Sequence, residues 1–273
     1  MRGFIDLHSH WVAAIDDGAR TPADSIDLLR ALFEAGFSTV VATPHMRPGM
    51  FDNTAPALRA AFERTQAAVG ELLPDRDPRD VRQSLPRDVR QSLPRSGLPE
   101  VLLASEHFFD DIVFDRIATG AALPYPSLSP AAAAGGKRSL LIELPTSRFP
   151  ARITHRIFDM MRLKIRPVIA HPERYEPVWD DPSALDPLLD AGAVLQLDVA
   201  ALTGRYGRAP RRAAEALLSE GYYHAASSDA HSLKDVAAVR QGIDLLFAAV
   251  GREEAEFLLI EGPRRILDAA VVT

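Results

Sequence analysis

Short apolar runs alternate with longer amphipathic segments along most of the chain. This alternation is typical of repeated strand and helix units whose strands form a mainly parallel sheet. We expect strands at seven places, namely residues 4–7, 39–43, 101–105, 140–144, 167–170, 194–197 and 222–226. Seven parallel strands are close to the number that closes a barrel. The pattern therefore predicts an α/β fold of the barrel type.

The segment after the first run carries the signals of a helix start. Thr21 is a favourable N-cap, Pro22 stands at the first helical position, and Asp24 is acidic in the first turn. Apolar residues then recur at helical spacing, at Ile26, Leu29, Leu32 and Phe33. The spacing predicts a helix that ends near Gly36.

A chain of 273 residues is long enough for one barrel-sized core. With 47% hydrophobic and 25% charged residues, its composition is that of an ordinary globular protein. We expect a single domain over residues 1–273, and a second domain is not required.

One segment interrupts the strand and helix pattern. Residues 74–99 are rich in Pro, Arg, Asp and Ser, and they contain the string RDVRQSLP twice, at 79–86 and 87–94. We expect a surface-loop insertion, because lengthening a loop costs little free energy. The alternative is a functional arm whose arginines bind an anionic partner.

Charge and cysteine content exclude several classes of function. The net charge of −6 and the pI near 5.8 disfavour nucleic-acid binding, because phosphate backbones are held by clustered Lys and Arg. The absence of cysteine excludes disulfides, thiolate metal ligands and cysteine nucleophiles. The N-terminus shows no signal-peptide pattern, and no segment reaches transmembrane length. We expect a cytoplasmic protein with no membrane insertion, whose mature chain starts near Met1.

Six of the seven predicted strands end in, or lead into, side chains that bind metals. These side chains are His8, His10, His45, Glu106, Glu143, His171, Asp229 and His231. The strands of a parallel barrel all end on one face, so residues far apart in sequence converge there. His8 and His10 are separated by one residue, so both can face one ion, because alternate residues of an extended chain point the same way. The Asp-x-His pair at 229 and 231 repeats this spacing, and Asp17 in the turn after the first strand can reach the same mouth.

These nine residues comprise five histidines and four carboxylates. Nitrogen and oxygen donors without sulfur suit Mn²⁺, Fe²⁺ or Zn²⁺, and nine donors are too many for one ion. A single strand-end histidine is more often hydrogen-bonded or solvated than ligated, but the joint placement favours ligation. Glu106 and Glu143 each follow an apolar run, where an unpaired carboxylate is costly. We therefore expect two or three ions that share carboxylates.

Three further histidines are left outside the predicted site. His155 falls in an amphipathic segment and is expected to be a structural residue of a helix, and His224 falls inside the predicted strand at 222–226. His107 adjoins Glu106, and the sequence leaves open whether it binds metal or serves the structure.

Clustered divalent ions lower the pKa of bound water and screen an anionic substrate, and phosphoester hydrolysis needs both effects. Arg47 in TPHMRPGM and Arg174 in AHPERY stand close to predicted ligands, so both guanidinium groups are candidates for holding phosphate oxygens. The alternative for each is a surface salt bridge. A glycine-flanked loop with Arg205 and Tyr206 adds to the same rim, and its role stays open.

Several strings occur here in the order found in one known family: DLHSH with IDDGA, TPHMRPGMF, ASEHFF, LIELP, VIAHPERY, LTGRYG and SSDAH. On these strings the chain resembles the manganese-dependent protein tyrosine phosphatases of the PHP (polymerase and histidinol phosphatase) type from bacterial capsule and exopolysaccharide loci. The similarity spans nearly the whole chain. It implies a distorted (β/α)7 TIM-like barrel, the PHP fold, and a site for three ions, with Mn²⁺ expected and Fe²⁺ or Zn²⁺ as alternatives.

The resemblance also implies a ligand set for each ion. The sets are His8, His10, Glu106 and Asp229; Glu106, Glu143 and His171; and Asp17, His45 and His231. The implied reaction is attack of metal-bound hydroxide on the phosphorus of phosphotyrosine, without a phosphoenzyme. Arg47 and Arg174 would orient the phosphate, and His45 and Asp229 would count among the catalytic residues. The implied substrates are tyrosine-phosphorylated tails of bacterial tyrosine kinases that control polysaccharide export.

Two departures from the family pattern, the repeated insertion and His107, bear on substrate choice more than on chemistry. The main alternative is a PHP phosphatase of a small metabolite such as histidinol phosphate, or a nucleotide phosphoesterase, because the same metals would serve it. A third hypothesis is a non-catalytic scaffold. Such a protein would be expected to have lost metal ligands, but every position that matches the family pattern holds a residue able to bind metal.

Overall fold

The computed structural model describes residues 3–73, 97–128 and 136–270. The predicted insertion at 74–99 therefore lies outside the described residues, except for residues 97–99. Within the described ranges no helix is long and apolar enough to cross a membrane.

The strands of the described chain all pair in parallel. They are β1 (Phe4–Ser9), β2 (Phe37–Ala42), β3 (His45–Met46), β4 (Glu100–Leu103), β5 (Glu106–Phe108), β6 (Arg138–Glu143), β7 (Ile165–Ala170), β8 (Val194–Asp198) and β9 (Ala225–Ser227). One sheet has the order β1-β2-β4, and the other has the order β3-β5-β6-β7-β8-β9. The predicted α/β fold with parallel strands is confirmed.

The chain passes twice from the three-stranded sheet directly into the six-stranded sheet. β2 is followed two residues later by β3, and β4 is followed in the same way by β5. Pro44 lies in the first break and has no N–H to donate to a ladder, and its carbonyl accepts a 2.6 Å hydrogen bond from the Ser105 hydroxyl. At the other edge, a parallel bridge joins Ser9 to Ala230, so the first strand lies beside the chain that follows the last.

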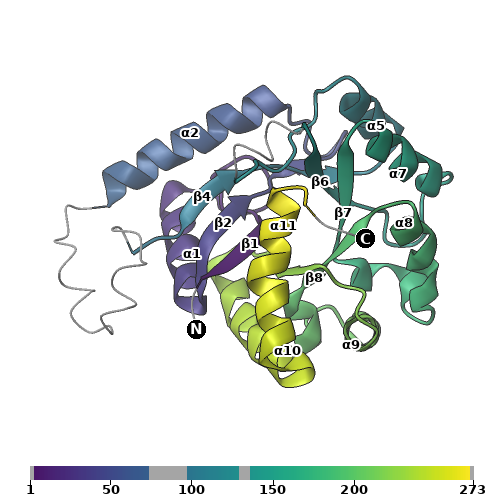
Figure 1. Cartoon of the computed structure of the whole chain (residues 1–273). Coiled ribbons are helices and arrows are strands. Elements are labelled where there is room, and N and C mark those ends of the chain that lie inside the picture. The colour runs from purple at the N-terminus through teal and green to yellow at the C-terminus, as the bar shows by residue number, and fades with distance from the viewer. Residues whose placement is uncertain (1–2, 74–96, 129–135, 271–273) are drawn as a thin grey trace.

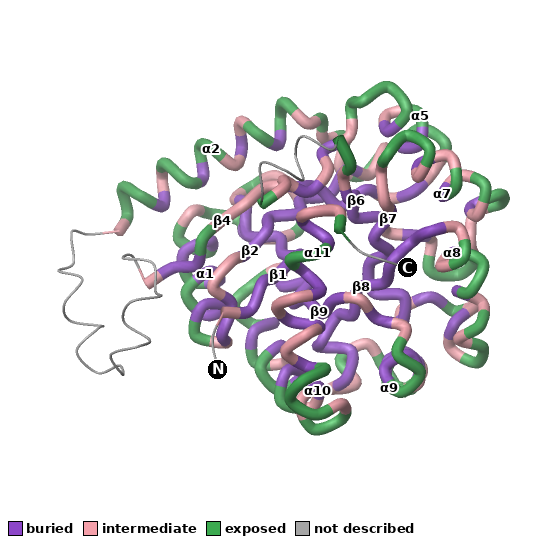
Figure 2. Tube along the Cα trace, in the orientation of Figure 1, coloured by how far each residue is buried: buried purple, intermediate pink, exposed green. Residues whose placement is uncertain are grey.

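Helices cover the outside of the strands (Figure 1). The α-helices are α1 (Pro22–Ala35), α2 (Ala55–Leu72), α5 (Asp111–Ala118), α7 (Ile153–Arg162), α8 (Asp186–Asp190), α9 (Arg208–Ser219), α10 (Val236–Glu256) and α11 (Gly262–Leu267). Short 3₁₀ turns are η1 (Pro172–Arg174), η2 (Glu176–Val178), η3 (Pro182–Leu185), η4 (Val199–Thr203) and η5 (Leu233–Asp235), and η6 (Phe257–Glu261) is a π turn. Figure 2 shows most of the strands buried, β4 intermediate, and the outer faces of the helices exposed.

The predicted helix after the first strand is confirmed as α1. The Thr21 hydroxyl accepts from the Asp24 N–H, and the Asp24 carboxylate accepts from the Thr21 N–H, which is a complete capping box. Gly36 ends the helix with φ of 115°, a left-handed conformation that glycine adopts without steric cost.

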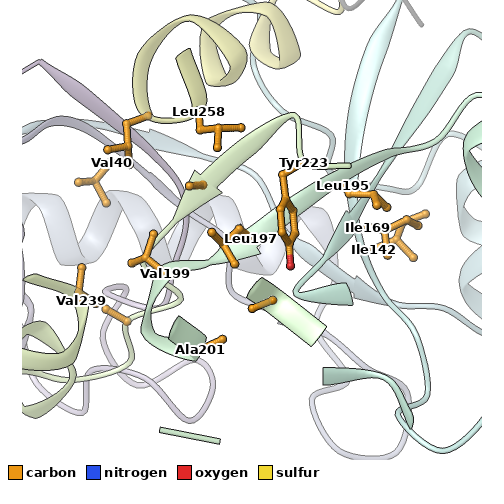
Figure 3. Packing of buried hydrophobic residues seen from close by; sticks show 14 of the residues in the cluster. Val40, Ile142, Ile169, Leu195, Leu197, Val199, Ala201, Tyr223, Val239 and Leu258 are labelled. Carbon is orange, nitrogen blue, oxygen red and sulfur yellow. The ribbon is translucent and has the colours of Figure 1, made fainter. Parts of the chain in front are cut away.

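Alternate residues of most strands enter two different apolar clusters. Val40, Ile142 and Ile169 belong to the larger cluster between strands and helices, of which Figure 3 shows a part. Their neighbours Val41, Leu141 and Val168 belong to a smaller cluster on the other face, where α11 adds Ile266 and Leu267. Both faces of the strands are therefore covered, as is usual for parallel sheets.

One predicted strand starts later than expected, and the prediction that His224 lies inside it is wrong. β9 begins at Ala225, whereas the prediction began at residue 222. The His224 N–H donates to Leu195 O at 2.9 Å, but the Leu195 N–H donates to the Nδ1 atom of the His224 ring at 3.3 Å. A side chain thus takes the position of a ladder carbonyl, and regular pairing with β8 starts one residue later.

Candidate metal centre

The structure brings all nine predicted ligands together at the carboxyl ends of the strands. Their donor atoms form four overlapping groups, and within each group these atoms lie no more than 4.8 Å apart. The groups are His10, Asp17, His45 and His231; His8, His10 and Asp229; His8, Glu106 and His171; and His45, Glu106 and Glu143. Since the groups share members, the nine residues form one continuous cluster.

Strand pairing explains much of this convergence. His45 of β3 is the direct neighbour of Glu106 in β5. The Asp229 N–H donates to His8 O at 2.9 Å, which ties the end of the last strand to the first. His171 and Asp229 have φ of 33° and 46°, so the chain turns sharply at both strand ends. Such conformations are unfavourable for non-glycine residues and are found most often at functional sites.

Glu106 is the centre of the cluster. Its Oε2 atom lies 2.9 Å from His45 Nδ1 and 3.3 Å from His8 Nε2, and its Oε1 atom lies 3.3 Å from His171 Nε2. Burial alone would raise the pKa of Glu106, but the imidazoles of His8 and His45 hold it well below the usual value. The side chain is therefore a carboxylate that bridges three histidines.

Two observations fit this donor set to metal ions. Within the described part of the chain, the buried atoms His171 Nδ1 and Glu143 Oε2 have no hydrogen-bond partner. Burial and the neighbouring charge of Glu106 raise the pKa of Glu143 to about 7. A carboxylate whose charge is disfavoured in this way gains most from a nearby cation. The donors are nitrogen and oxygen without sulfur, so the cluster could hold Mn²⁺, Fe²⁺ or Zn²⁺.

Asp16 also belongs to the centre, although it was not among the residues predicted from the sequence. Its Oδ2 atom lies 2.8 Å from His10 Nδ1 and accepts from the His45 N–H at 3.1 Å. Asp17 has Oδ1 at 3.3 Å from His45 Nε2 and 3.6 Å from His231 Nε2. The two adjacent aspartates of the turn therefore contact different atoms of the histidine cluster. The signal was present in the string IDDG, but spacing alone did not separate their roles.

Arg174 lies at the edge of the cluster. Its Nη2 atom donates to Asp229 Oδ2 at 2.6 Å and also to Asp198 Oδ2. Its guanidinium stacks on the Tyr206 ring, with 3.8 Å between Cζ and the ring centroid. Asp198 is the last residue of β8, the one predicted strand to which no polar end was assigned. Asp198 could have been predicted by the same rule as the other eight strand-end residues, namely a polar side chain at or just after the end of an apolar strand.

Glu173 is fully buried beside Arg174. It accepts hydrogen bonds from the Asp198 N–H at 3.0 Å and from the Tyr223 hydroxyl at 2.9 Å. Burial raises the pKa of Glu173 to about 8, and the charge of Asp198 acts in the same direction. Glu173 therefore ties η1 to the end of β8 and adds little negative charge at neutral pH.

Arg47 reaches the cluster from another side. Its Nη1 atom lies 3.8 Å from Glu143 Oε2, and its guanidinium stacks on the Phe108 ring at 4.0 Å. The Phe51 ring stacks on His45, with 5.2 Å between centroids. Aromatic rings therefore border the histidines next to Arg47.

A cavity of about 690 Å³ opens onto the centre. Its walls include Asp17, Asp229 and His231 of the cluster, together with Arg174, Arg205 and Tyr206. Arg205 donates to Asp235, whose other oxygen accepts from the His231 N–H at 2.9 Å. Arg205 therefore lies on the rim, as the sequence predicted for its loop, and is linked to the segment that carries His231.

The histidines left outside the predicted site have other surroundings. His107 is fully buried, its Nδ1 atom lies 3.2 Å from Leu141 O, and its Nε2 atom accepts from the Leu123 N–H at 3.3 Å. Burial lowers the pKa of His107 to about 4, so the ring is neutral and both nitrogens serve backbone groups. His155 is exposed on α7.

The parallel α/β fold and the buried cluster of histidines and carboxylates at its strand ends define a protein of the metal-dependent α/β enzyme class. The chain belongs to the family described as capsular polysaccharide synthesis, CpsB/CapC, whose sequence model matches residues 4–76 and 129–268. The resemblance found in the strings of the sequence is thereby confirmed.

Individual relatives agree with this membership. The chain is 29% identical to the tyrosine-protein phosphatase YwqE of Bacillus subtilis over 231 residues, which cover 84% of this chain and 78% of that protein. It is 23% identical to the tyrosine-protein phosphatase CpsB of Streptococcus pneumoniae over 269 residues, covering 96% and 98%.

Solved structures show the same likeness. A crystal structure from work on YwqE and CpsB, described as unique metal-dependent tyrosine phosphatases, matches with a TM-score of 0.76 and 26% identity over 98% of this chain and 96% of that one. The phosphotriesterase homology protein of Escherichia coli matches with a TM-score of 0.54 at 14% identity over 97% and 98% of the two chains, and so shares the fold alone.

Proposed function

We propose that this protein is a metal-dependent phosphoric monoester hydrolase that removes phosphate from phosphotyrosine in proteins. Its relatives YwqE and CpsB are tyrosine-protein phosphatases. The observation that carries the proposal is the cluster of nine donors beside an open cavity that Arg174 also lines.

The proposed cofactor is Mn²⁺, with two or three ions in the cluster, and Fe²⁺ or Zn²⁺ as alternatives. The proposed ligand sets are His8, His10, Glu106 and Asp229; Glu106, Glu143 and His171; and Asp17, His45 and His231. The short separations within these sets support the assignment. Divalent ions bound here would lower the pKa of a bound water and screen the charge of the phosphate.

The protein's own residues would orient the phosphate. Arg174 faces the cavity and carries a positive charge next to Asp229, so it is placed to bind a phosphate oxygen as the ester enters. Arg47 would hold the phosphate from the side of Glu143. His45 and Asp229, as proposed ligands, would count among the catalytic residues.

We further propose a distorted (β/α)7 barrel of the PHP type that forms one domain over residues 1–273. The breaks between β2 and β3 and between β4 and β5 support a count of seven, since each pair would be one interrupted strand. The 2.9 Å hydrogen bond from the His10 N–H to Ala230 O supports closure of the barrel. The family match stops at residue 76 and resumes at 129, which supports an insertion around the repeat at 79–94.

The proposed substrate in the cell is a phosphotyrosine protein, in particular the tail of a bacterial tyrosine kinase of polysaccharide biosynthesis. Membership of a capsular polysaccharide synthesis family supports this choice. A cavity that is open to solvent would admit a peptide. The cytoplasmic location and the absence of nucleic-acid binding stay predictions.

The test is a turnover comparison among a phosphotyrosine peptide, a phosphoserine peptide and histidinol phosphate, with the metal content measured on the same sample. We expect the chelated protein to be inactive, Mn²⁺ to restore turnover, and the phosphotyrosine peptide to have the highest kcat/KM. His171→Ala should lower the rate by several orders of magnitude, whereas His155→Ala, an exposed histidine on α7, should not. Full activity in excess chelator would exclude the metal mechanism, and a clear preference for histidinol phosphate would favour the small-metabolite alternative.

A further inference from the structure

We propose that Asp198 is a positioning residue, which fixes the Arg174 guanidinium at the mouth of the metal centre so that it is ready to receive the phosphate. The inference rests on the proposed phosphatase function. It assigns a role to a strand-end carboxylate that lies outside the nine predicted ligands.

The Asp198 carboxylate is itself immobilised. The side chain is 1% exposed, and both of its oxygens are engaged. Oδ1 accepts from the Ala200 N–H at 2.8 Å, and Oδ2 accepts from Arg174 Nη2. The first bond belongs to the start of η4, so the backbone restrains the carboxylate independently of its contact with Arg174.

The backbone also ties Asp198 to the turn that carries Arg174. The Asp198 N–H donates to the side-chain carboxyl oxygen Oε1 of Glu173, the residue before Arg174 in η1. η1 and the end of β8 are thus joined twice, once through Glu173 and once through the guanidinium. The separation between the Asp198 carboxylate and the Arg174 side chain is therefore fixed by two neighbouring elements.

Tyr206 restricts the Arg174 side chain by covering one face of its guanidinium. Its ring lies 3.8 Å from the guanidinium, so Asp198 restrains one edge of the group and Tyr206 one face. A long arginine side chain loses much rotamer freedom when it is held in one place. Because Asp198 and Tyr206 impose this loss during folding, phosphate binding does not have to impose it again.

Asp198 also bears on Asp229, which contacts both Arg174 and the histidine cluster. Arg174 Nη2 contacts Asp229 Oδ2, while Asp229 Oδ1 lies 3.1 Å from His8 Nε2. With Asp198 as a second counter-ion, Arg174 engages only the Oδ2 atom of Asp229, and the Oδ1 atom of Asp229 faces the histidine cluster. Without Asp198, Asp229 would be the only carboxylate, within the described residues, to form an ion pair with Arg174.

The decisive experiment is a double-mutant cycle between Asp198→Asn and Arg174→Met in the manganese-loaded protein. Asparagine keeps an oxygen for the Ala200 N–H but loses the charge that faces Arg174. We expect D198N to raise KM for a phosphotyrosine peptide, and the Kd of inorganic phosphate measured by calorimetry, by roughly tenfold each, in line with the loss of a charge-assisted hydrogen bond. In the R174M background, the same change should have no further effect, and the manganese content should stay equal in all four proteins.

A second double-mutant cycle, between Tyr206→Leu and Arg174→Met, tests the restraint on Arg174 even if D198N does not fold. Tyr206→Leu removes the stacked ring and is expected to raise the phosphate Kd about threefold in the wild type and not at all in R174M. Asp186→Asn is the matched control, because Asp186 is an exposed carboxylate that accepts from the Tyr222 hydroxyl, and it should leave all constants unchanged. Equal losses in the wild-type and R174M backgrounds would overturn the positioning role.

Failure of the proposed phosphatase function and failure of the positioning role of Asp198 would give different results. If the wild-type protein hydrolyses no phosphoester with any metal, the proposed function falls, but the calorimetric cycle with inorganic phosphate still decides the role of Asp198. If the wild-type protein is an active phosphatase and D198N binds phosphate as tightly as the wild type, the positioning role alone is excluded.

Discussion

The Oδ2 atom of Asp16 lies 2.8 Å from the Nδ1 atom of His10, and both side chains are inaccessible to solvent. The contact fixes the orientation of the imidazole. With Nδ1 turned to Asp16, the Nε2 atom of His10 points into the cluster, 3.2 Å from His8 Nε2 and 3.5 Å from Asp229 Oδ1. A carboxylate behind a ligating histidine is a common means of setting the tautomer and raising the basicity of the ligand.

Asp16→Ala is therefore expected to weaken metal binding although Asp16 is not one of the nine proposed ligands. Loss of such an outer partner typically lowers metal affinity or activity by roughly 10- to 100-fold. Competition between the protein and a metal-binding dye measures the affinity for Mn²⁺. Asp244→Ala, at an exposed position of α10, is the control and should bind Mn²⁺ like the wild type. An unchanged affinity in D16A would remove Asp16 from the centre.

The turn after β1 packs closely against His10 at Gly18, and a substitution at Gly18 tests this packing. A Cβ added at Gly18 would lie 1.9 Å from His10 O, so Gly18→Ala must displace the backbone of a proposed ligand. Overpacking of this kind costs about 1–3 kcal/mol, and metal affinity should fall as well. Gly70→Ala is the matched control, since a Cβ there meets nothing within 4 Å. Because Gly70 lies inside α2, alanine should stabilise the protein by about 0.5–1 kcal/mol in denaturant unfolding. Equal stability of the two variants would contradict this view of the turn.

The sequence predicted the strand ends well because buried strands are marked by unbroken apolar runs. It could not predict how two of these strands are divided between sheets. At the break, the Pro44 carbonyl accepts a hydrogen bond from Ser105, a residue sixty-one positions away, and no local pattern predicts such a contact. The start of the strand expected at 222–226 was wrong for a similar reason, since the His224 ring replaces a backbone acceptor and β9 begins at Ala225, and propensity does not describe such an exchange.

Within the site, the sequence identified residues that can bind metal but not the residues that hold them in place. Asp198 satisfied the strand-end rule used for the others and was overlooked. Asp16 and Asp17 are adjacent, and only their contacts separate the residue that orients His10 from the one that faces the mouth. His107 was left open, and its two backbone partners, Leu141 and Leu123, come from different segments that no local pattern connects to it.

Arg47 is expected to contribute to phosphate binding more than to the fold. Its side chain rests on Phe108 and approaches Glu143 at 3.8 Å, so methionine can keep the packing while losing the charge. A hydrogen bond to a charged group contributes about 1.5–3 kcal/mol, and Arg47→Met should raise KM for a phosphotyrosine peptide by about tenfold or more. Arg240→Met removes an exposed arginine that pairs with Glu34 and should leave KM unchanged. Wild-type KM in R47M would assign Arg47 to a surface salt bridge.

His224 gives the fold a pH dependence that is separate from the metal centre. Burial lowers the pKa of this histidine, and the positive charge of Arg166 in β7 acts in the same direction. The Nδ1 atom must stay unprotonated to accept the Leu195 N–H. In the unfolded chain the histidine has its ordinary pKa near 6.5, so the unfolded state binds more protons than the folded state just below that pH. The stability contributed by neutral His224 is therefore complete above pH 6.5 and is lost as the pH falls below it.

His224→Asn is expected to flatten this part of the stability curve. An asparagine carbonyl can accept the Leu195 N–H but does not titrate, so the variant should lose less stability than the wild type between pH 7.5 and pH 5. The measurement is the free energy of unfolding in urea at a series of pH values, with the difference between the two proteins removing the contribution of every other titrating group. His155→Asn, which replaces an exposed histidine on α7, should give a curve parallel to the wild type. If H224N and the wild type also ran parallel, the hydrogen bond between the His224 ring and Leu195 could not be the source of the acid sensitivity.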